Sequence, residues 1–319
     1  MTRIAVLDDY QRVAQSYADW ASLPKGSEVQ FFVDRPSDSA QLAERLASFD
    51  VIVAMRERTP FPRAILAQLP NLRLLVTTGM RNAAIDVAAA TQMGIAVCGT
   101  DGLPYPTAEL TWALILALAR KLPSEDRALR AGQWQTSIGI GLRGKTLALL
   151  GLGRLGSQVA RIGVAFGMHV IAWSPNLTAS RAELGGAELV SRDELFVRAD
   201  VLSIHLVLSE RTRSLVGERE LALLKRSALL INTSRGPIVD EASLVRALHS
   251  RALGGAGLDV FDREPLPPEH PLLSLANTVL TPHLGYVTEE TYRLFYGQAL
   301  EDIHAYLAGD PKRVLGPNG

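Results

Sequence analysis

The sequence predicts an α/β protein made of two doubly wound parallel-sheet domains. Three observations support this fold class. The chain has 319 residues, which at roughly 150 residues per domain suggests two domains. Short apolar runs alternate with amphipathic helical patterns along its length, and such strands, joined through helices, pair in parallel. A glycine-rich loop at 151–156 joins one such run to a helical pattern.

The first domain is predicted to contain five buried strands. They are expected at residues 4–7, 29–32, 51–54, 72–76 and 95–97. Amphipathic stretches at 40–47 and 63–69 are predicted helices between them. The stretch 99–106 is rich in glycine and proline, so we expect the chain to cross between domains there.

The second domain is predicted to contain six strands. They are expected at residues 146–150, 169–173, 201–205, 228–232, 256–259 and 278–281. A final helix is expected at 289–307, with Thr288 as its N-cap. We expect this helix to return to the first domain. The first domain would then comprise 1–100 and 287–319, and the second 101–286.

Composition narrows the function classes. The chain has 33 basic and 33 acidic residues and a formal net charge of zero, which argues against a nucleic-acid binder. Its one cysteine, Cys98, lies in an apolar run, so we predict a core residue and no cysteine-based metal site. No signal-peptide pattern is visible at the start. The apolar stretch 110–119 is about half a membrane span and predicts a buried helix. We expect a cytoplasmic protein without a membrane partner.

The glycine-rich loop has the pattern G-x-G-x-x-G and follows a predicted strand. Its candidate binding residues are Gly151, Gly153, Arg154, Leu155 and Gly156. The first glycine allows a tight turn, the second lets a pyrophosphate approach the backbone, and the third lets helix and strand pack closely. The helix N-terminus offers N–H groups to the phosphates. The pattern predicts a nicotinamide dinucleotide site.

The choice between NAD and NADP stays open. Ser174 stands at the end of the next predicted strand, where an acidic residue would bind the adenosine ribose. The missing carboxylate removes the repulsion that would exclude a 2′-phosphate. Arg154 and Arg181 are candidate partners for such a phosphate, although both also fit solvated surface positions.

Three residues predict acid–base chemistry on a carboxylate substrate. Arg235, Glu264 and His283 each follow a predicted strand of the second domain, where ligands bind in open α/β sheets. An arginine binds a carboxylate bidentately and polarises the adjacent carbonyl. A histidine moves a proton near neutral pH, and a carboxylate orients that histidine.

These segments resemble the D-isomer-specific 2-hydroxyacid dehydrogenase family, which includes D-glycerate and D-3-phosphoglycerate dehydrogenases. The resemblance runs from about residue 50 to 288. It rests on the glycine loop and on 231–236 (INTSRG), 257–260 (GLDV), 264–265 (EP) and 277–285 (NTVLTPHLG).

The resemblance implies a flavodoxin-like substrate domain hinged to a Rossmann domain. It implies a homodimer through the Rossmann domain, to which the 110–119 helix is expected to contribute. It makes His283 the acid/base, Glu264 its partner and Arg235 the substrate clamp. Further implied cofactor contacts are His205, Thr233 and Asp259.

The first domain departs from the family pattern at its substrate loop. A typical loop is rich in glycine, but here Gly79 is followed by Met80, Arg81 and Asn82. We expect Gly79, Arg81 and Asn82 to help bind the substrate, while Arg81 also fits an ion pair with a nearby acid. Arg58 is a further candidate.

Other side chains leave two interpretations open. Arg56, near Arg58, is either a cleft residue or a solvated charge. Trp134 and Tyr286 are either apolar cleft walls or buried packing residues.

The predicted activity is transfer of a hydride between NAD(P)H and C2 of a small anionic 2-keto acid or D-2-hydroxy acid. The alternative is a corepressor-like protein that senses dinucleotides without turnover. The intact Arg235, Glu264 and His283 set disfavours that alternative.

Overall fold

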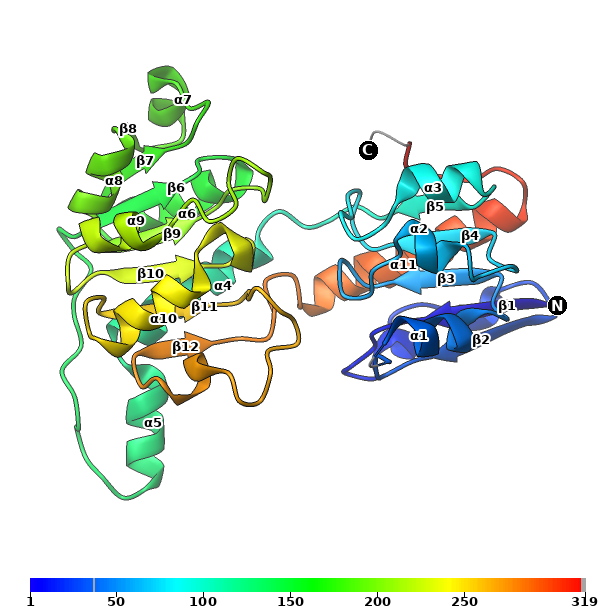
Figure 1. Ribbon diagram of the computed structural model, residues 1–319, viewed down its shortest axis with the longest axis horizontal. Helices are drawn as coiled ribbons and strands as arrows, with labels where there is room; N and C mark the ends of the chain where they lie inside the picture. The colour runs from blue at the N-terminus through cyan, green and yellow to red at the C-terminus, as the bar shows by residue number, and fades with distance from the viewer. Residues whose placement is uncertain (37, 317–319) are drawn as a thin grey trace. The chain divides into compact units, whose positions relative to one another are not determined.

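The computed structural model describes residues 1–36 and 38–316, which form two compact units (Figure 1). Unit 1 contains Met1–Leu103 and the segment from Thr288 onward, and unit 2 is Pro104–Val287. The sequence-based limits were 1–100 with 287–319 and 101–286. Residues 317–319 of that predicted range lie outside the described residues.

Unit 1 is built on a five-stranded parallel sheet in the order β2-β1-β3-β4-β5. Its strands are β1 (Thr2–Val6), β2 (Ser27–Phe31), β3 (Val51–Ala54), β4 (Leu74–Thr77) and β5 (Ala96–Gly99). The strand order reverses between β1 and β3. This is the flavodoxin-like order, and it confirms the fold predicted for this part of the chain.

Helices cover both faces of the unit 1 sheet. They are η1 (Ala14–Ser16), η2 (Trp20–Ser22), α1 (Ser39–Leu46), α2 (Arg63–Leu66), α3 (Val87–Gln92) and α11 (Glu289–Leu307). Figure 1 shows α1, α2 and α3 on one face and α11 on the other. Ala5, Ile52 and Leu75 belong to the core cluster on the α1–α3 side. Thr288 caps α11 as predicted, because its hydroxyl accepts the Thr291 N–H at 3.3 Å.

Unit 2 is built on a seven-stranded parallel sheet in the order β12-β11-β10-β9-β6-β7-β8. Its strands are β6 (Thr146–Leu150), β7 (His169–Trp173), β8 (Glu188–Leu189), β9 (Val201–Ile204), β10 (Leu229–Asn232), β11 (Gly255–Leu258) and β12 (Thr278–Leu280). The chain extends the sheet from β6 to β8 and then crosses back to β9. The β6–β9 boundary is the switch point where doubly wound sheets bind ligands, and the predicted Rossmann topology is confirmed.

Alternate residues of β6 face opposite helical layers of unit 2. The helices are α4 (Pro106–Ala119), α5 (Leu122–Arg130), α6 (Arg154–Ala165), α7 (Ala179–Leu184), α8 (Arg192–Arg198), α9 (Glu218–Leu223), η3 (Gly236–Ile238), α10 (Glu241–His249) and η4 (Pro271–Ser274). Leu147 and Leu149 pack with α4 and α6, whereas Ala148 and Leu150 pack with α8, α9 and α10. Burial on both faces explains why the strand is continuously apolar.

Two edge strands differ from expectation. The predicted strand 29–32 was expected to be buried on both faces, but Glu28 and Gln30 of β2 are exposed. The reason is its position at the edge of the sheet, beside β1 alone. The second is β8, at the edge of the unit 2 sheet beside β7. It has two residues and was not predicted, because so short a strand leaves no periodic pattern.

Two expectations from composition concern the single cysteine and the absence of a membrane span. Cys98 is fully buried, as predicted, and burial raises the pKa of its thiol to about 12. Such a thiol is unreactive near neutral pH. Across the described ranges, the helices are too short or too polar to cross a membrane.

Candidate active site

The predicted site residues of unit 2 follow six strands of its parallel sheet, so they share its carboxyl edge. They are the 151–156 loop after β6, Ser174 after β7, His205 after β9, Thr233 and Arg235 after β10, Asp259 and Glu264 after β11, and His283 after β12. Parallel pairing aligns these ends. The predicted residues of unit 1 follow β3 and β4 in its own sheet.

The three loop glycines have different structural roles. Gly151 has φ of +106°, and a Cβ there would lie 2.6 Å from the His205 carbonyl oxygen. A Cβ on Gly156 would collide with the Gly151 carbonyl, so α6 can approach the loop only without a side chain. A Cβ on Gly153 would meet no protein atom within 4 Å. The fold therefore requires the outer glycines, while the space at Gly153 fits an approaching pyrophosphate.

The N-terminus of α6 also fits a phosphate group. Gly153 is its N-cap, and no side chain within the described ranges caps the helix. Arg154 and Leu155 are its first two residues, and Arg154 is exposed. Uncapped N–H groups and the positive end of the helix dipole favour an anion. The residues present therefore fit a dinucleotide.

Ser174 lies next to the glycine loop. Leu150 pairs with Trp173 in the sheet, and the Gly151 N–H donates to the Trp173 carbonyl at 2.9 Å. Strand β7 would be expected to present an acidic residue to the adenosine ribose, but it is followed by the hydroxyl side chain of Ser174. Arg181 is exposed on α7.

His205 is a neutral histidine beside the glycine loop. Burial lowers its pKa to about 4, and its Nε2 lies 2.8 Å from the Ser203 hydroxyl. Its Nδ1 is buried and has no hydrogen-bond partner in the described part of the chain. Buried polar atoms are normally paired. The unpaired nitrogen therefore fits a position beside a bound ligand.

The turn after β10 is held by a residue that sequence reasoning did not single out. The Asn232 amide donates to the Arg235 carbonyl at 2.9 Å, and its oxygen accepts the Ser234 N–H at 3.0 Å. An asparagine at a strand end is a signal for such a turn. Thr233 lies 2.9 Å from the Thr111 hydroxyl of α4, and the Arg235 guanidinium donates to the Ser234 carbonyl at 2.7 Å.

The Arg235 turn contacts the loop that carries Glu264. A Cβ on Gly236 would collide with the carbonyl group of Phe261 and lie 2.6 Å from the Asp262 nitrogen. Glycine is therefore needed directly after Arg235, where the two loops pack against each other.

Glu264 and His283 form a hydrogen-bonded pair. Glu264 Oε2 lies 2.7 Å from His283 Nδ1, and Oε1 accepts the Phe261 N–H at 2.9 Å. Burial acts to raise the pKa of Glu264, but the hydrogen bond and charge of His283, the Phe261 N–H and the Arg235 charge together lower it. An ionised carboxylate only accepts hydrogen bonds. His283 must therefore donate the Nδ1 proton to Glu264. The other ring nitrogen, Nε2, is then the atom that can exchange a proton with a substrate.

The loop carrying His283 is held by Asp259. His283 has φ of +56°, which is unusual for a residue with a side chain, and its N–H donates to the Asp259 carbonyl at 2.9 Å. The Asp259 carboxylate accepts the Thr281 hydroxyl at 2.6 Å and the N–H groups of Leu284 and Gly285 at 2.7 and 2.8 Å. Burial raises the pKa of Asp259 despite these bonds. Such over-determined strain is typical of functional sites.

The unit 1 loop is also closely packed. The Asn82 amide donates to the Arg56 carbonyl at 2.6 Å and to Thr77 Oγ1 at 2.8 Å, and its oxygen accepts the Ala84 N–H at 2.9 Å. Gly79 has φ of +96°, and a Cβ there would collide with the Arg56 guanidinium. Arg56 is thus a partly buried residue, with its side chain 25% exposed.

The remaining candidates differ in exposure. Arg58 donates to the Asp8 carbonyl at 2.9 Å and lies over the Tyr10 ring, 4.8 Å from its centroid. Arg81 is exposed. The Tyr286 ring meets His283 edge-on at 5.7 Å. Trp134 is 77% exposed, so its interpretation as a buried packing residue is wrong.

Fold and loop geometry together define a class of protein. A doubly wound sheet has a glycine loop and an uncapped helix at its switch point, with a histidine–carboxylate pair and an arginine along the same edge. This combination is that of a dinucleotide-dependent oxidoreductase. Among the residues described, no group of three or more His, Cys, Asp or Glu side chains could hold a metal ion.

Comparison with known proteins defines the family. Residues 112–285 match the pattern of the D-isomer specific 2-hydroxyacid dehydrogenase, NAD binding domain. The glyoxylate reductase of Aeropyrum pernix is 44% identical over 255 residues, which cover 77% of this chain and 76% of that protein. The chain belongs to the D-isomer specific 2-hydroxyacid dehydrogenase family. It is an NAD(P)-dependent enzyme of the class that interconverts 2-keto acids and D-2-hydroxy acids.

Two further relatives support this assignment. The D-3-phosphoglycerate dehydrogenase of Methanocaldococcus jannaschii is 38% identical over 274 residues, or 85% of this chain, but the match spans only 52% of that relative. A crystal structure from Ralstonia solanacearum, described as a candidate D-3-phosphoglycerate dehydrogenase oxidoreductase, has a TM-score of 0.93 at 38% identity. It covers 99% of this chain and 97% of its own.

Proposed function

We propose that the protein reduces a small 2-keto acid to the D-2-hydroxy acid, with His283 as proton donor and Arg235 as substrate clamp. The observation that carries this proposal is the 2.7 Å contact between His283 Nδ1 and the ionised Glu264. It leaves Nε2 as the proton-exchanging atom. A glutamate in this role suits a reaction in which a hydroxyl proton is gained or lost.

The chain's own residues have separate tasks in this mechanism. Arg235 binds the substrate carboxylate and polarises the C2 carbonyl through its guanidinium. Glu264 holds the imidazole through Nδ1, and Nε2 gives a proton to the C2 oxygen. Asp259 keeps the His283 loop in place through its three accepted hydrogen bonds. Bound NAD(P)H supplies the hydride for C2.

The glycine loop and its neighbours form the proposed cofactor contacts. Gly151, Gly153 and Gly156 shape the pyrophosphate site, and His205 and Thr233 line the same edge of the sheet. Asp259 stays a predicted contact to the nicotinamide carboxamide. In this structure its side chain is fully buried and accepts three hydrogen bonds.

In unit 1, the proposed substrate contacts are the Gly79 backbone, Arg81 and Arg58. Asn82 uses both ends of its amide within the protein, so we assign it the task of shaping this loop. The exposed Arg81 adds a cation where the family pattern has glycine. If Arg81 binds substrate, Arg81→Ala raises KM for the keto acid; an unchanged KM for every keto acid turned over contradicts this role.

The proposed substrate is a keto acid of about the size of glyoxylate. This proposal is supported by the 44% identity to a protein named glyoxylate reductase. The test is a kinetic comparison of glyoxylate, hydroxypyruvate, pyruvate and bulkier 2-keto acids with NADH and NADPH. The highest kcat/KM is expected for one of the two- or three-carbon acids. A preference for bulky acids contradicts the size assignment, and tight dinucleotide binding without turnover would instead indicate the sensor alternative.

His283→Ala tests the acid–base role directly. The variant is expected to lose keto-acid reduction while its affinity for NADH stays near that of the unmodified protein. Retained turnover would contradict the role of His283 as proton donor.

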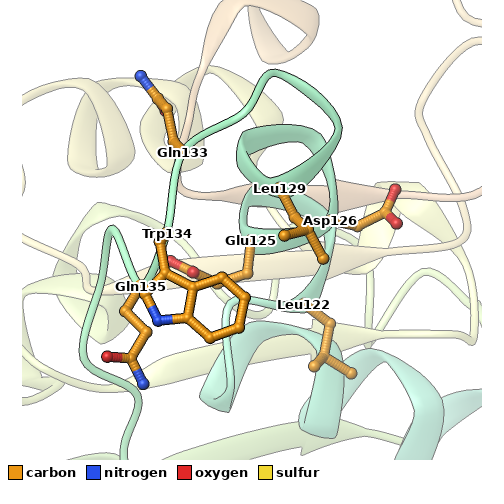
Figure 2. Close-up of a pocket in the computed structure, with 7 residues that line it drawn as sticks. All are labelled: Leu122, Glu125, Asp126, Leu129, Gln133, Trp134 and Gln135. Atoms are coloured by element: carbon orange, nitrogen blue, oxygen red, sulfur yellow. The ribbon is translucent and has the colours of Figure 1, made fainter.

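We further propose that unit 2 forms a homodimer through α5 and the segment that follows it. Figure 1 shows this segment extending from the sheet of unit 2. None of the residues of α5 is buried, and Leu122, Leu129 and Trp134 are 55%, 57% and 77% exposed. They line the hollow in Figure 2 with Glu125, Asp126, Gln133 and Gln135. Apolar side chains presented together on an extended segment are typical of an interface.

This placement refines the expected contribution of the 110–119 helix. Trp112, Leu114 and Ile115 of α4 are buried within unit 2, so the continuation of the chain after α4 supplies the exposed apolar side chains. Sedimentation analysis of Trp134→Ser is expected to show monomers, whereas the control Leu184→Ser, at a residue 86% exposed on α7, stays dimeric. Monomeric unmodified protein contradicts the dimer. The expected cytoplasmic location stays a prediction.

A further inference from the structure

Two consecutive main-chain N–H groups in the loop after β11 each donate to a different glutamate. The Phe261 N–H donates to Glu264 Oε1 at 2.9 Å. The next, on Asp262, donates to Glu241 Oε2 at 3.3 Å. Glu241 is the first residue of α10. Phe261, which joins the two peptide units that carry these N–H groups, therefore links the proposed catalytic carboxylate to a second carboxylate held on a helix.

Each of these two glutamates is paired with a histidine. Glu264 contacts His283, and Glu241 Oε1 lies 2.9 Å from His270 Nε2. His270 Nδ1 accepts the Leu272 N–H at 3.3 Å, which requires the proton of a neutral His270 to be on Nε2. His270 is thus a donor to Glu241. The side chains of His270 and Glu241 are only 15% and 22% exposed, so their hydrogen bond is largely shielded from water.

The His270 end of this chain of contacts is anchored in the core. His270 is the N-cap of η4, and Leu272 within η4 is fully buried. The other end meets the Arg235 turn, because Gly236 packs directly against the Phe261–Asp262 peptide. A shift of Phe261 would therefore move the N–H group that holds Glu264 and press its carbonyl group against Gly236, the residue next to Arg235.

We propose that Glu241 and His270 form a positioning pair that sets the orientation of Glu264 toward His283. This inference depends on the proposed roles of Glu264 and His283. His270 fixes the Glu241 carboxylate, Glu241 holds the Asp262 N–H, and the adjacent Phe261 N–H then directs Glu264. Neither member of the pair touches the reacting atoms in this scheme.

The test compares His270→Ala with His270→Gln and a matched control. The alanine variant is expected to lower kcat about 10- to 100-fold, the range expected for a misplaced catalytic group, while the Kd for NADH stays unchanged. The glutamine variant restores an N–H donor to Glu241 and is expected to recover most of kcat. The control Ser274→Ala removes a 2.9 Å hydrogen bond to Pro271 in the same turn and should leave kcat unchanged.

A double-mutant cycle with Glu264→Gln separates positioning from general loss of structure. If His270 acts through Glu264, adding His270→Ala to Glu264→Gln changes kcat by less than about twofold. The pH profile of kcat/KM in His270→Ala is also expected to shift in the same direction as in Glu264→Gln. Should His270→Ala not fold, Glu241→Gln serves in the same cycle, because a glutamine has one acceptor oxygen and cannot accept from both His270 and the Asp262 N–H.

The outcomes distinguish this inference from the proposed function. A kcat unaffected by His270→Ala, or an equal loss in the Glu264→Gln background, overturns the positioning role. If the unmodified protein reduces no keto acid, the proposed function fails. NMR of the His283 imidazole in cofactor-free protein still tests the pair in that case. Its signals are expected to move in His270→Ala as they do in Glu264→Gln, and unchanged signals overturn the inference.

Discussion

Alanine at Gly153 and at Gly156 is expected to have opposite consequences, although the two glycines belong to one loop. A methyl group at Gly156 meets the Gly151 carbonyl, whereas a methyl group at Gly153 meets no protein atom within 4 Å. Gly153 has φ of −85° and ψ of −160°, a conformation open to alanine. The substitution at Gly156 therefore disturbs the protein, and the one at Gly153 fills space outside it.

The magnitudes follow from these contacts. Gly156→Ala inserts a methyl group against rigid backbone and should lower the free energy of unfolding by about 1–3 kcal/mol. Gly153→Ala should leave it unchanged or raise it by up to about 1 kcal/mol, because alanine restricts the unfolded chain. The same methyl group stands where the pyrophosphate must approach. We expect the Kd for NADH to rise at least about tenfold, which corresponds to about 1.4 kcal/mol.

Urea unfolding and titration of NADH and NADPH fluorescence measure the two effects separately. Gly297→Ala is the control, since a Cβ there meets nothing within 4 Å and the residue lies inside α11 of unit 1. It should stabilise the protein by about 1 kcal/mol and leave binding unchanged. If Gly153→Ala binds both dinucleotides with unmodified affinity, the pyrophosphate does not lie against Gly153 and the assignment of the loop is refuted.

Three further predictions concern the same edge of unit 2. Ser174→Asp should lower the ratio of kcat/KM for NADPH to that for NADH at least about tenfold, because a carboxylate repels a 2′-phosphate; an unchanged ratio places the ribose elsewhere. The folded-state pKa of His205, lowered to about 4 from an ordinary value of 6.5, makes stability fall as pH drops below 6.5. Between pH 7 and 5 this loss is about 2 kcal/mol. It should be absent in His205→Gln by urea unfolding, and an equal loss in that variant contradicts the burial of His205. Asn232→Ala leaves the Ser234 N–H and the Arg235 carbonyl without their partner, so it should cost about 1–3 kcal/mol and lower kcat. A variant with normal kcat would show that the turn does not depend on Asn232 for positioning Arg235.

The order of the strands could be predicted from local sequence, since eleven strands are expected close to where the structure has them, and among the described residues only the two-residue strand β8 was not expected. Burial on both sheet faces makes the central strands continuously apolar, and that signal is strong. The edge strands were less predictable, because β2 is half exposed and β8 is too short to show a period. The positions of Arg235, Glu264 and His283 were also predictable, since each follows a strand in a recognisable stretch.

The pairing of Glu264 with His283 was implied by the family resemblance, but the other contacts that hold these residues were not predictable. The Asn232 turn, the hold of Asp259 on the His283 loop and the link from His270 to the Glu264 loop join groups on different loops. Asn82 shows the same limitation in unit 1. A polar residue after a strand reads as a candidate ligand, and only its hydrogen bonds show that it holds the backbone instead.

The sequence by itself determined the fold class, the glycine loop and the chemical types available at the strand ends, because periodicity and backbone constraints are local properties. The tertiary structure decided which atoms of those residues are occupied by hydrogen bonds within the protein and which are available for proton transfer. Glu264 uses one oxygen for the loop and the other for His283, which directs Nε2 to the proton transfer. Such assignments depend on distances between loops far apart in the chain, and those distances arise only when parallel strands bring their carboxyl ends together.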